Sequence, residues 1–139
     1  MKPSILMSAA VVGLILTGDA HANSCPPECP SGKIPLGIIA PTSGPPAAFG
    51  RQAVRPAEIA VEAINASGGL MGLPIALTIA DDKCDSGLAI AAARRQIASD
   101  RISAVIGPIC PGAVDMAAPI YSEAGVIEFL PTVSTKGFG

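Results

Sequence analysis

The sequence has few of the groups from which catalytic or nucleic-acid-binding surfaces are built. Its 139 residues include no Trp, one Tyr, three Phe and one His, and only 14% are charged. So few aromatic residues offer little surface on which bases or sugars could stack. Nine Lys and Arg residues stand against eleven Asp and Glu residues, a formal net charge of −2. A protein that grips nucleic acid or an anionic membrane needs a clustered basic face, so we expect no nucleic-acid partner.

The single histidine, His21, lies in a segment with the pattern of a secretory signal peptide. Residues 1–22 begin with Lys2, continue as an apolar run over 5–16 and end in Ala-His-Ala. The run is too short to span a bilayer as a helix, and the alternative is a buried N-terminal helix. We expect cleavage after Ala22 and a secreted or periplasmic product. That product would lack histidine, which excludes a Ser–His or Cys–His nucleophile pair, so no enzyme is expected.

Export gives a meaning to the four cysteines, Cys25, Cys29, Cys84 and Cys110. An even number in an oxidising compartment indicates disulfides, and four cysteines allow three connectivities. The simplest joins the local pair in the Pro-rich leader (23–33) and the distant pair beyond it. A four-thiolate zinc site would need two short C-x-x-C-like pairs, and the sequence has one, with three intervening residues. We expect disulfides and no metal.

Beyond the leader, short apolar runs alternate with helical patterns. The patterns predict strands over 34–40, 73–80, 102–106 and 126–130, and helices over 51–66, from 85 or 86 to about 99, and from about 112 to 124. Nearly continuous apolar strands that alternate with helices are typical of a parallel sheet covered on both faces, a three-layer, doubly wound α/β fold. Ligands bind such sheets at the carboxyl ends of the strands, here near 41–44, 108–112 and 132–135.

The residues at that edge carry little catalytic chemistry. No glycine-rich phosphate loop follows the first strand, so we expect no nucleotide cofactor. Asp81 and Asp82 could form a carboxylate pair or a metal site, but a solvated acidic strand end is the favoured interpretation; Asp85 is expected to cap a helix. The free N–H groups of the helix that begins near Gly112 could hold a ligand carboxylate, helped by Ser134. The alternative is that these loops merely connect elements.

Six short motifs follow one another in a characteristic order. They are Ile-Ile-Ala-Pro-Thr-Ser-Gly-Pro at 38–45, Phe-Gly at 49–50, Ile-Asn-Ala-Ser-Gly-Gly at 64–69, Asp-Asp-Lys-Cys-Asp at 81–85, Val-Ile-Gly-Pro at 105–108 with Cys110, and Ile-Tyr at 120–121 with Gly-Val at 125–126. This series resembles the periplasmic branched-chain amino-acid-binding proteins, the type I solute-binding components of ABC importers. The resemblance runs from about Ile34 to the C-terminus.

The resemblance implies a fold, a disulfide and a partner. Family members have two α/β lobes that close on a ligand, and residues 34–139 look like most of the first lobe, with strand order 2-1-3-4. A Cys84–Cys110 disulfide and delivery of the ligand to ABC permease subunits are implied as well. The chain would then be a fragment, a truncated reading frame or one of two pairing chains, and would bind weakly. An extracytoplasmic sensor domain with the same fold is the alternative.

The resemblance also implies ligand contacts at individual positions. Phe49 falls where the family has an aromatic residue before glycine, and Ile109 where a backbone carbonyl meets the ligand. Pro111 replaces a serine that donates to the ligand carboxylate, so both a hydroxyl and an N–H are lost. Ser134 stands for a late threonine that holds the same carboxylate. The expected set for an amino acid or another small carboxylate or amide is Phe49, Ile109, Cys110, Pro111, Gly112, Thr132, Val133 and Ser134.

Overall fold

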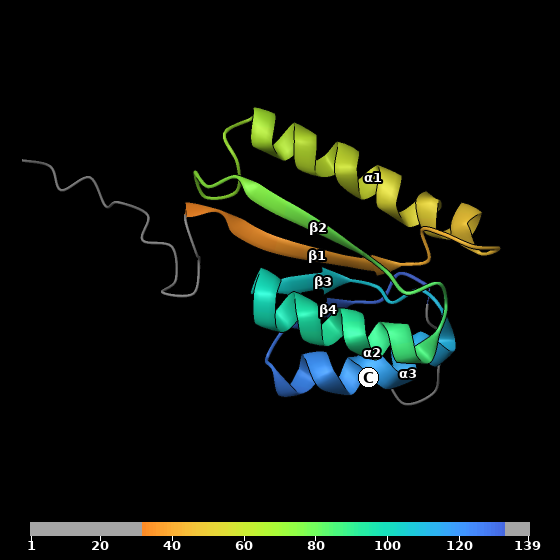
Figure 1. The fold of residues 1–139 in the computed structure, drawn as a ribbon. Coiled ribbons are helices and arrows are strands. Elements are labelled where there is room, and N and C mark those ends of the chain that lie inside the picture. Colours follow the sequence, from red (N-terminus) through yellow and green to blue (C-terminus); the bar gives the residue numbers. More distant parts are fainter. Residues whose placement is uncertain (1–31, 133–139) are drawn as a thin grey trace, which may run out of the picture.

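A computed structural model of the chain describes residues 32–132 (Figure 1). The expected signal peptide, the Cys25–Cys29 pair, Val133 and Ser134 lie outside the described residues. The elements are β1 (Ile34–Ala40), α1 (Ala47–Ala66), β2 (Ile75–Asp81), α2 (Ser86–Arg95), the π-helical segment η2 (Gln96–Asp100), β3 (Ala104–Ile106), α3 (Pro111–Glu123) and β4 (Ile127–Phe129). Among these residues no helix is both long and apolar enough to cross a membrane.

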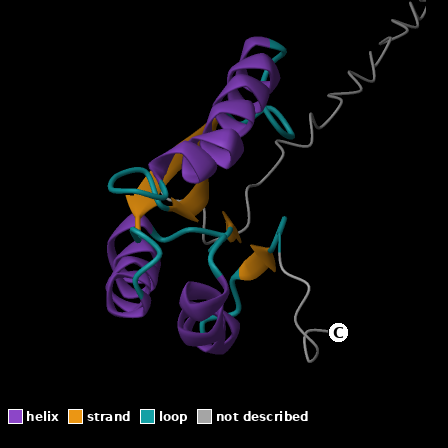
Figure 2. Cartoon of the chain, turned by 90° about the vertical axis from the view of Figure 1, so that its right-hand side faces the viewer, coloured by secondary structure: helices purple, strands orange, loops and turns teal. Residues whose placement is uncertain are grey.

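The four strands form one parallel sheet in the order β2-β1-β3-β4. Helix α1 covers β1 and β2 on one face, and α2 and α3 cover the other (Figures 1 and 2). The predicted three-layer α/β fold and the strand order 2-1-3-4 are therefore confirmed. The central strand β1 is buried along most of its length, which is why it reads as a continuous apolar run rather than an alternating one.

Two glycines allow close backbone approaches at the carboxyl ends of β1 and β3. A Cβ on Gly50 would lie 2.0 Å from the Pro41 carbonyl oxygen, so only glycine lets the first turn of α1 pack on the end of β1. Gly107 has φ +93°, and a Cβ there would lie 2.1 Å from the Ile39 carbonyl oxygen. The helix predicted over 51–66 corresponds to α1. Its predicted start at residue 51 was wrong, because α1 already begins at Ala47.

Each face of the sheet has its own core. Ile38, Ala40, Val54 and Ile109 pack beneath α1. Beneath α2 and α3 the buried residues are Ile39, Ala80, Ala89, Ala93, Ile102, Val105, Ala113, Ala117 and Tyr121. In this second core the Tyr121 hydroxyl donates to Gln96 Oε1 at 2.6 Å, and Gln96 Nε2 donates to the Ile38 carbonyl at 3.0 Å. These bonds satisfy buried polar groups and join α3, η2 and β1.

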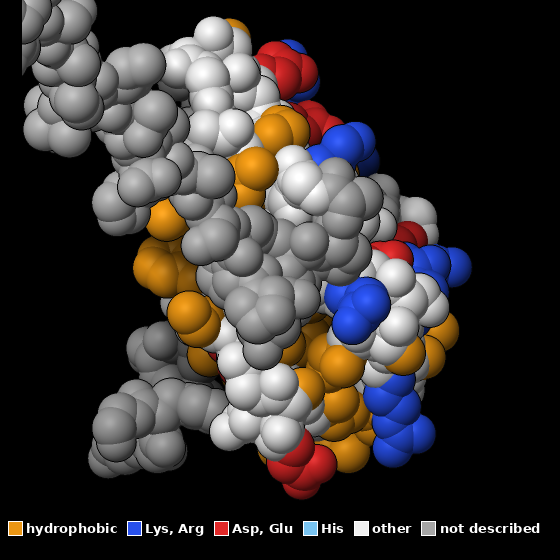
Figure 3. Space-filling view, turned by 90° about the vertical axis from the view of Figure 1, so that its left-hand side faces the viewer, with side chains coloured by type: hydrophobic (Ala, Val, Ile, Leu, Met, Phe, Trp, Pro, Cys, Tyr) orange, Lys and Arg blue, Asp and Glu red, His pale blue; other side chains and the backbone are white. Residues whose placement is uncertain are grey.

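The β4 side of the sheet is the less covered one. Ile127 is 73% exposed and Phe129 is 65% exposed. Figure 3 shows hydrophobic side chains along this flank, seen from the amino ends of the strands. Glu128 points to the opposite face, and its Oε1 is buried without a partner among the described residues. Burial raises the pKa of the Glu128 carboxyl to about 7.

Candidate functional site

The loops that follow the four strands gather at one end of the sheet, which we call the carboxyl edge: residues 41–46, 82–85, 107–110 and 130–132. This end faces the viewer in Figure 2. Parallel strands necessarily place these loops together, whatever their distance in the sequence. The carboxyl edge is therefore the part of the fold where residues from four separate segments can meet one ligand.

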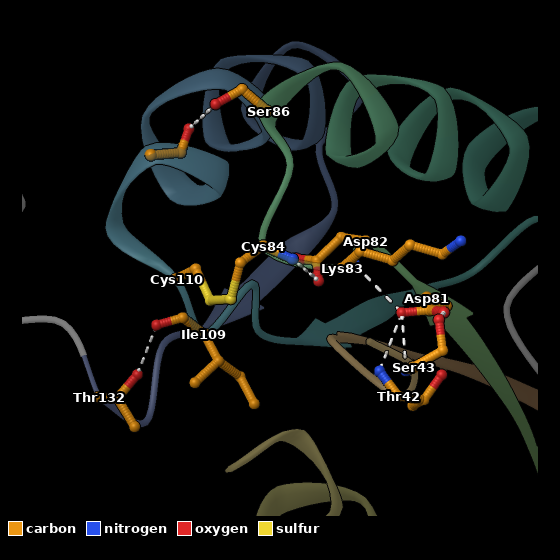
Figure 4. The surroundings of a disulfide bond; sticks show 11 residues. Thr42, Ser43, Asp81, Asp82, Lys83, Cys84, Ser86, Ile109, Cys110 and Thr132 are labelled. Carbon is orange, nitrogen blue, oxygen red and sulfur yellow. Dashed lines mark hydrogen bonds between the residues drawn. A yellow bond between two sulfur atoms is a disulfide. The ribbon is translucent and has the colours of Figure 1, made fainter. Parts of the chain in front are cut away.

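The Cys84–Cys110 disulfide joins the loops after β2 and β3, with Cα atoms 5.4 Å apart (Figure 4). Because β1 lies between these two strands, the bridge passes over the end of β1. Close to it, Ser86 Oγ donates to the Gly112 carbonyl at 2.9 Å and connects the first turns of α2 and α3. The implied disulfide is thus confirmed, and it fixes two loops of the carboxyl edge to each other.

Asp81 connects the loops after β1 and β2. Its Oδ1 accepts hydrogen bonds from the backbone N–H groups of Thr42 at 2.9 Å and of Lys83 at 3.1 Å. The Ser43 N–H donates to the same oxygen at 3.4 Å, and the Ser43 hydroxyl donates to Oδ2. Burial opposes ionisation of Asp81, but the hydrogen bonds from Ser43, Thr42 and Lys83 outweigh it and lower the pKa of this carboxyl.

Asp82 and Asp85 have different surroundings. Asp82 is fully buried on the α2 side; its Oδ1 accepts from the Cys84 N–H at 3.1 Å, and its Oδ2 has no partner among the described residues. Burial, together with the charges of Asp81 and Asp85, raises the pKa of Asp82. Asp85 caps α2 by accepting from the Leu88 N–H at 2.8 Å, as predicted. The interpretation of Asp81 and Asp82 as a solvated strand end was therefore wrong for Asp82, whereas Asp81 is only part-buried.

The two carboxylates do not form a shared pair. Successive residues along extended backbone point to opposite faces of the sheet. Asp81 therefore faces the loop after β1, while Asp82 lies on the face that α2 covers. Within residues 32–132 no group of three His, Cys, Asp or Glu side chains is placed to hold a metal ion. Asp81 instead accepts from the loop after β1, and Asp82 accepts from Cys84 within the loop after β2.

The first turn of α3 offers one free donor. The helix begins at Pro111, which has no N–H, and the Cys110 carbonyl accepts from Ala113 at 2.9 Å and Val114 at 3.0 Å. The Ala113 N–H is therefore occupied. Gly112 is exposed, and its N–H donates to none of the described residues. The positive end of the α3 dipole and the Gly112 N–H remain for an anion.

Ile109 and Thr132 lie together, although 23 residues separate them in the chain. Thr132 Oγ1 donates to the Ile109 carbonyl at 3.0 Å, which ties the end of β4 to the loop after β3 (Figure 4). The Ile109 side chain is 3% exposed and belongs to the core beneath α1. Its carbonyl retains one lone pair for a ligand N–H, because a carbonyl oxygen has two.

Phe49 reaches the carboxyl edge from another element. It lies in the first turn of α1 and is 45% exposed. The structure thus brings together Ile109, Cys110, Gly112 and Thr132 around the start of α3, while Phe49 lies apart from them in the first turn of α1. Sequence reasoning missed the contact of Asp81 with Thr42 and Ser43. The polar Thr-Ser pair after the neighbouring strand was the signal that could have suggested it.

Comparison with known proteins gives relatives along most of the chain. A family model described as periplasmic binding protein matches residues 33–139. An amino acid binding protein of Pseudomonas aeruginosa is 41% identical over 96 residues, 69% of this chain and 26% of that protein. The Leu/Ile/Val-binding protein BraC3 of Rhizobium johnstonii is 36% identical over 134 residues, 96% of this chain and 34% of that protein. The chain therefore spans only about a quarter to a third of the length of these relatives.

Solved structures share the fold. The branched-chain amino acid transporter substrate binding protein LivJ from Streptococcus pneumoniae, in complex with isoleucine, superposes with a TM-score of 0.72 at 31% identity, over 76% of this chain and 30% of that chain. A solute binding protein of an ABC transporter from R. palustris, in complex with benzoate, gives a TM-score of 0.65 at 26% identity, over 73% of this chain and 28% of that chain.

Proposed function

Since the chain belongs to the periplasmic binding protein family, we propose that it provides the first lobe of an extracytoplasmic solute-binding component of an ABC importer. The observation that carries this proposal is the cross-linking of all four loops at the carboxyl edge. Asp81 joins the first loop to the second, the disulfide joins the second to the third, and Thr132 joins the fourth to the third. A set of loops held in this way is a preorganised surface for one ligand.

The groups free at this edge suit a small carboxylate or amide, such as an amino acid. The Gly112 N–H, at the positive end of the α3 dipole, can donate to a ligand oxygen. The second lone pair of the Ile109 carbonyl can accept from a ligand N–H, and the exposed ring of Phe49 offers apolar surface. Relatives of this chain were solved with isoleucine and with benzoate, which are both small carboxylates.

The role has two further parts, export and delivery. Residues 1–22 would direct export, and a Cys84–Cys110 disulfide persists in an oxidising compartment such as the periplasm. Outside the inner membrane, the loaded protein would pass its ligand to the ABC permease subunits without chemical change. Binding and release, not catalysis, are the whole of this proposed activity.

The proposal is tested by titrating the 15N-labelled chain with L-isoleucine and with benzoate, and by following the backbone amides. One lobe covers only one side of a ligand, so we expect weak binding, with dissociation constants of about 1 mM or higher. A dissociation constant of about 1 mM corresponds to a binding free energy near −4 kcal/mol. The amides of Gly107, Ile109, Cys110 and Gly112 should shift together and saturate. The control ligand sec-butylamine, which has an amine but no carboxylate, should leave Gly112 unshifted. If neither carboxylate shifts the carboxyl edge, the chain does not bind solutes of this class.

A further inference from the structure

Asp81 is the most heavily bonded side chain of the carboxyl edge. It is the last residue of β2 and accepts four hydrogen bonds, three from backbone N–H groups and one from a hydroxyl. Figure 4 shows its carboxylate facing Thr42 and Ser43, away from the disulfide. The donors belong to the loops after β1 and β2. One side chain therefore sets the position of the loop over 41–46 relative to the sheet.

This loop in turn sets where α1 begins. The Pro41 carbonyl oxygen lies so close to Gly50 that a Cβ there would be only 2.0 Å from it. The N–H groups of Phe49 and Gly50 both donate to the Pro46 carbonyl, at 3.0 and 3.2 Å. Loop and first helical turn are thus packed as one unit. A shift of the loop away from Asp81 would move Phe49 with it.

We propose that Asp81 is a positioning residue of the binding edge: its carboxylate holds the loop over 41–46, and through it Phe49, in the arrangement that receives the ligand. This inference rests on the proposed solute-binding function. Asp81 itself acts through the loop and does not need to touch the ligand. Its removal should therefore weaken binding without removing any group that contacts the ligand.

The ionised form of Asp81 is the one that fits its partners. Three of the four donors are backbone N–H groups, which cannot accept a proton donated by a neutral carboxyl. The charged and titratable neighbours are Asp82 and Asp85, Lys83 beside it, and Arg95, which lines the same groove next to β2. Protonation of Asp81 would reverse the bond with the Ser43 hydroxyl and would leave only a neutral oxygen for the three N–H groups, whose bonds are stronger to a charged acceptor. Acid should therefore loosen the loop.

The test compares three variants of the full chain by amide spectra and by affinity for L-isoleucine and benzoate. Asp81→Asn should shift the amides of Thr42, Ser43 and Phe49 and weaken both affinities about tenfold. Ser43→Ala, which removes one of the four bonds, should weaken them about threefold. The matched control is Asp100→Asn in η2 at the opposite end of the sheet, because the Asp100 side chain bonds to none of the described residues. It should leave the affinities and the loop amides unchanged.

A pH series separates positioning from a merely structural role. This series uses L-isoleucine, because its carboxylate stays ionised to lower pH than that of benzoate. The wild-type affinity for L-isoleucine should fall as Asp81 is protonated below its lowered pKa, whereas that of Asp81→Asn should stay flat over the same acid range. If Asp81→Asn shifts the loop amides yet binds both probes as tightly as wild type, the inference is wrong. Should Asp81→Asn fail to fold, Ser43→Ala decides, and unchanged affinity there contradicts the inference.

The proposed function can fail separately from the inference. If wild type binds neither probe, solute binding is wrong, and the ligand-free spectra then judge Asp81 alone. In that case an Asp81→Asn spectrum in which Phe49 keeps its wild-type position overturns the link between Asp81 and α1. A spectrum in which Phe49 shifts with Thr42 and Ser43 supports that link.

Discussion

Replacing Pro111 with serine is expected to strengthen binding of L-isoleucine. Pro111 occupies the first position of α3 and has no N–H, and Gly112 carries the free donor that follows it. Serine would add an N–H and a hydroxyl at the positive end of the helix dipole, where a carboxylate is favoured. A hydrogen bond to a charged group contributes about 1.5–3 kcal/mol. Because this edge is exposed to water, the lower end applies, which corresponds to about a tenfold gain in affinity.

The same substitution should lower the stability of the free protein. Proline is favoured at the first position of a helix, and it restricts the unfolded chain by about 0.4–1 kcal/mol relative to other residues. Pro111→Ser should therefore melt a few degrees below wild type while binding more tightly. Opposite signs in the two measurements distinguish a new ligand contact from a general improvement of the fold.

Pro111→Ala separates the two groups that serine adds, because alanine restores the N–H without the hydroxyl. We expect its affinity for L-isoleucine to lie between those of wild type and Pro111→Ser in the same amide titration. Equal affinities for wild type and Pro111→Ser would refute the reasoning. So would a wild-type chain that already binds L-isoleucine with sub-micromolar affinity, because the missing donor would then have no importance.

Three further predictions concern stability. Cys84→Ser combined with Cys110→Ser opens a loop of 26 residues and should cost about 3 kcal/mol in urea unfolding, and equal midpoints for the oxidised and the double-variant proteins would contradict this. Burial raises the pKa of Glu128 from 4.5 to about 7, so the stability it contributes is complete below about pH 4.5 and lost as the pH rises through 7. The destabilisation by the ionised carboxyl at pH 8, reduced because Glu128 is partly exposed, is about 1 kcal/mol. Glu128→Gln should therefore melt roughly 4–8 °C above wild type at pH 8 and match it at pH 4. The same difference in melting temperature at both pH values would exclude titration as the cause. Gly50→Ala should lose about 1–3 kcal/mol of unfolding free energy through overpacking against the first loop. The control Gly87→Ala, whose added Cβ meets only the Asp85 carboxylate at 3.2 Å, should change stability little. Similar losses in both variants would contradict the close approach at Gly50.

The order of elements could be predicted because burial leaves a simple signature. Strands buried on both faces read as continuous apolar runs, as residues 34–40 do, and helices between them follow a period of 3.6 residues. The start of α1 was missed because residues 47–50, Ala-Ala-Phe-Gly, form a helical turn through contacts with the end of β1 rather than through their own periodicity. Likewise β3 and β4 are shorter than their apolar runs, since hydrogen-bonded pairing, and not hydrophobicity, defines their ends.

The site was predictable only where a local motif carried it. The number and spacing of the cysteines indicated the disulfide. The helical pattern from about residue 112 indicated free N–H groups near Gly112. The role of Asp81 depends on the register of β1 and β2, which places it beside Ala40 and hence next to the first loop. Register is not encoded in either strand alone. The bond between Thr132 and Ile109 was missed for the same reason, because it joins the ends of two strands that meet only in the folded sheet.

The most direct test of the account is to locate a bound ligand on the molecule. Intermolecular nuclear Overhauser effects between 13C-labelled L-isoleucine and the protein would do this, even for weak binding. We predict cross-peaks from the ligand to Phe49, Gly112 and Thr132 at the carboxyl edge. Cross-peaks instead to Val54 and Ile79, which line a groove of about 560 Å³ between α1 and β2, would contradict the proposed site.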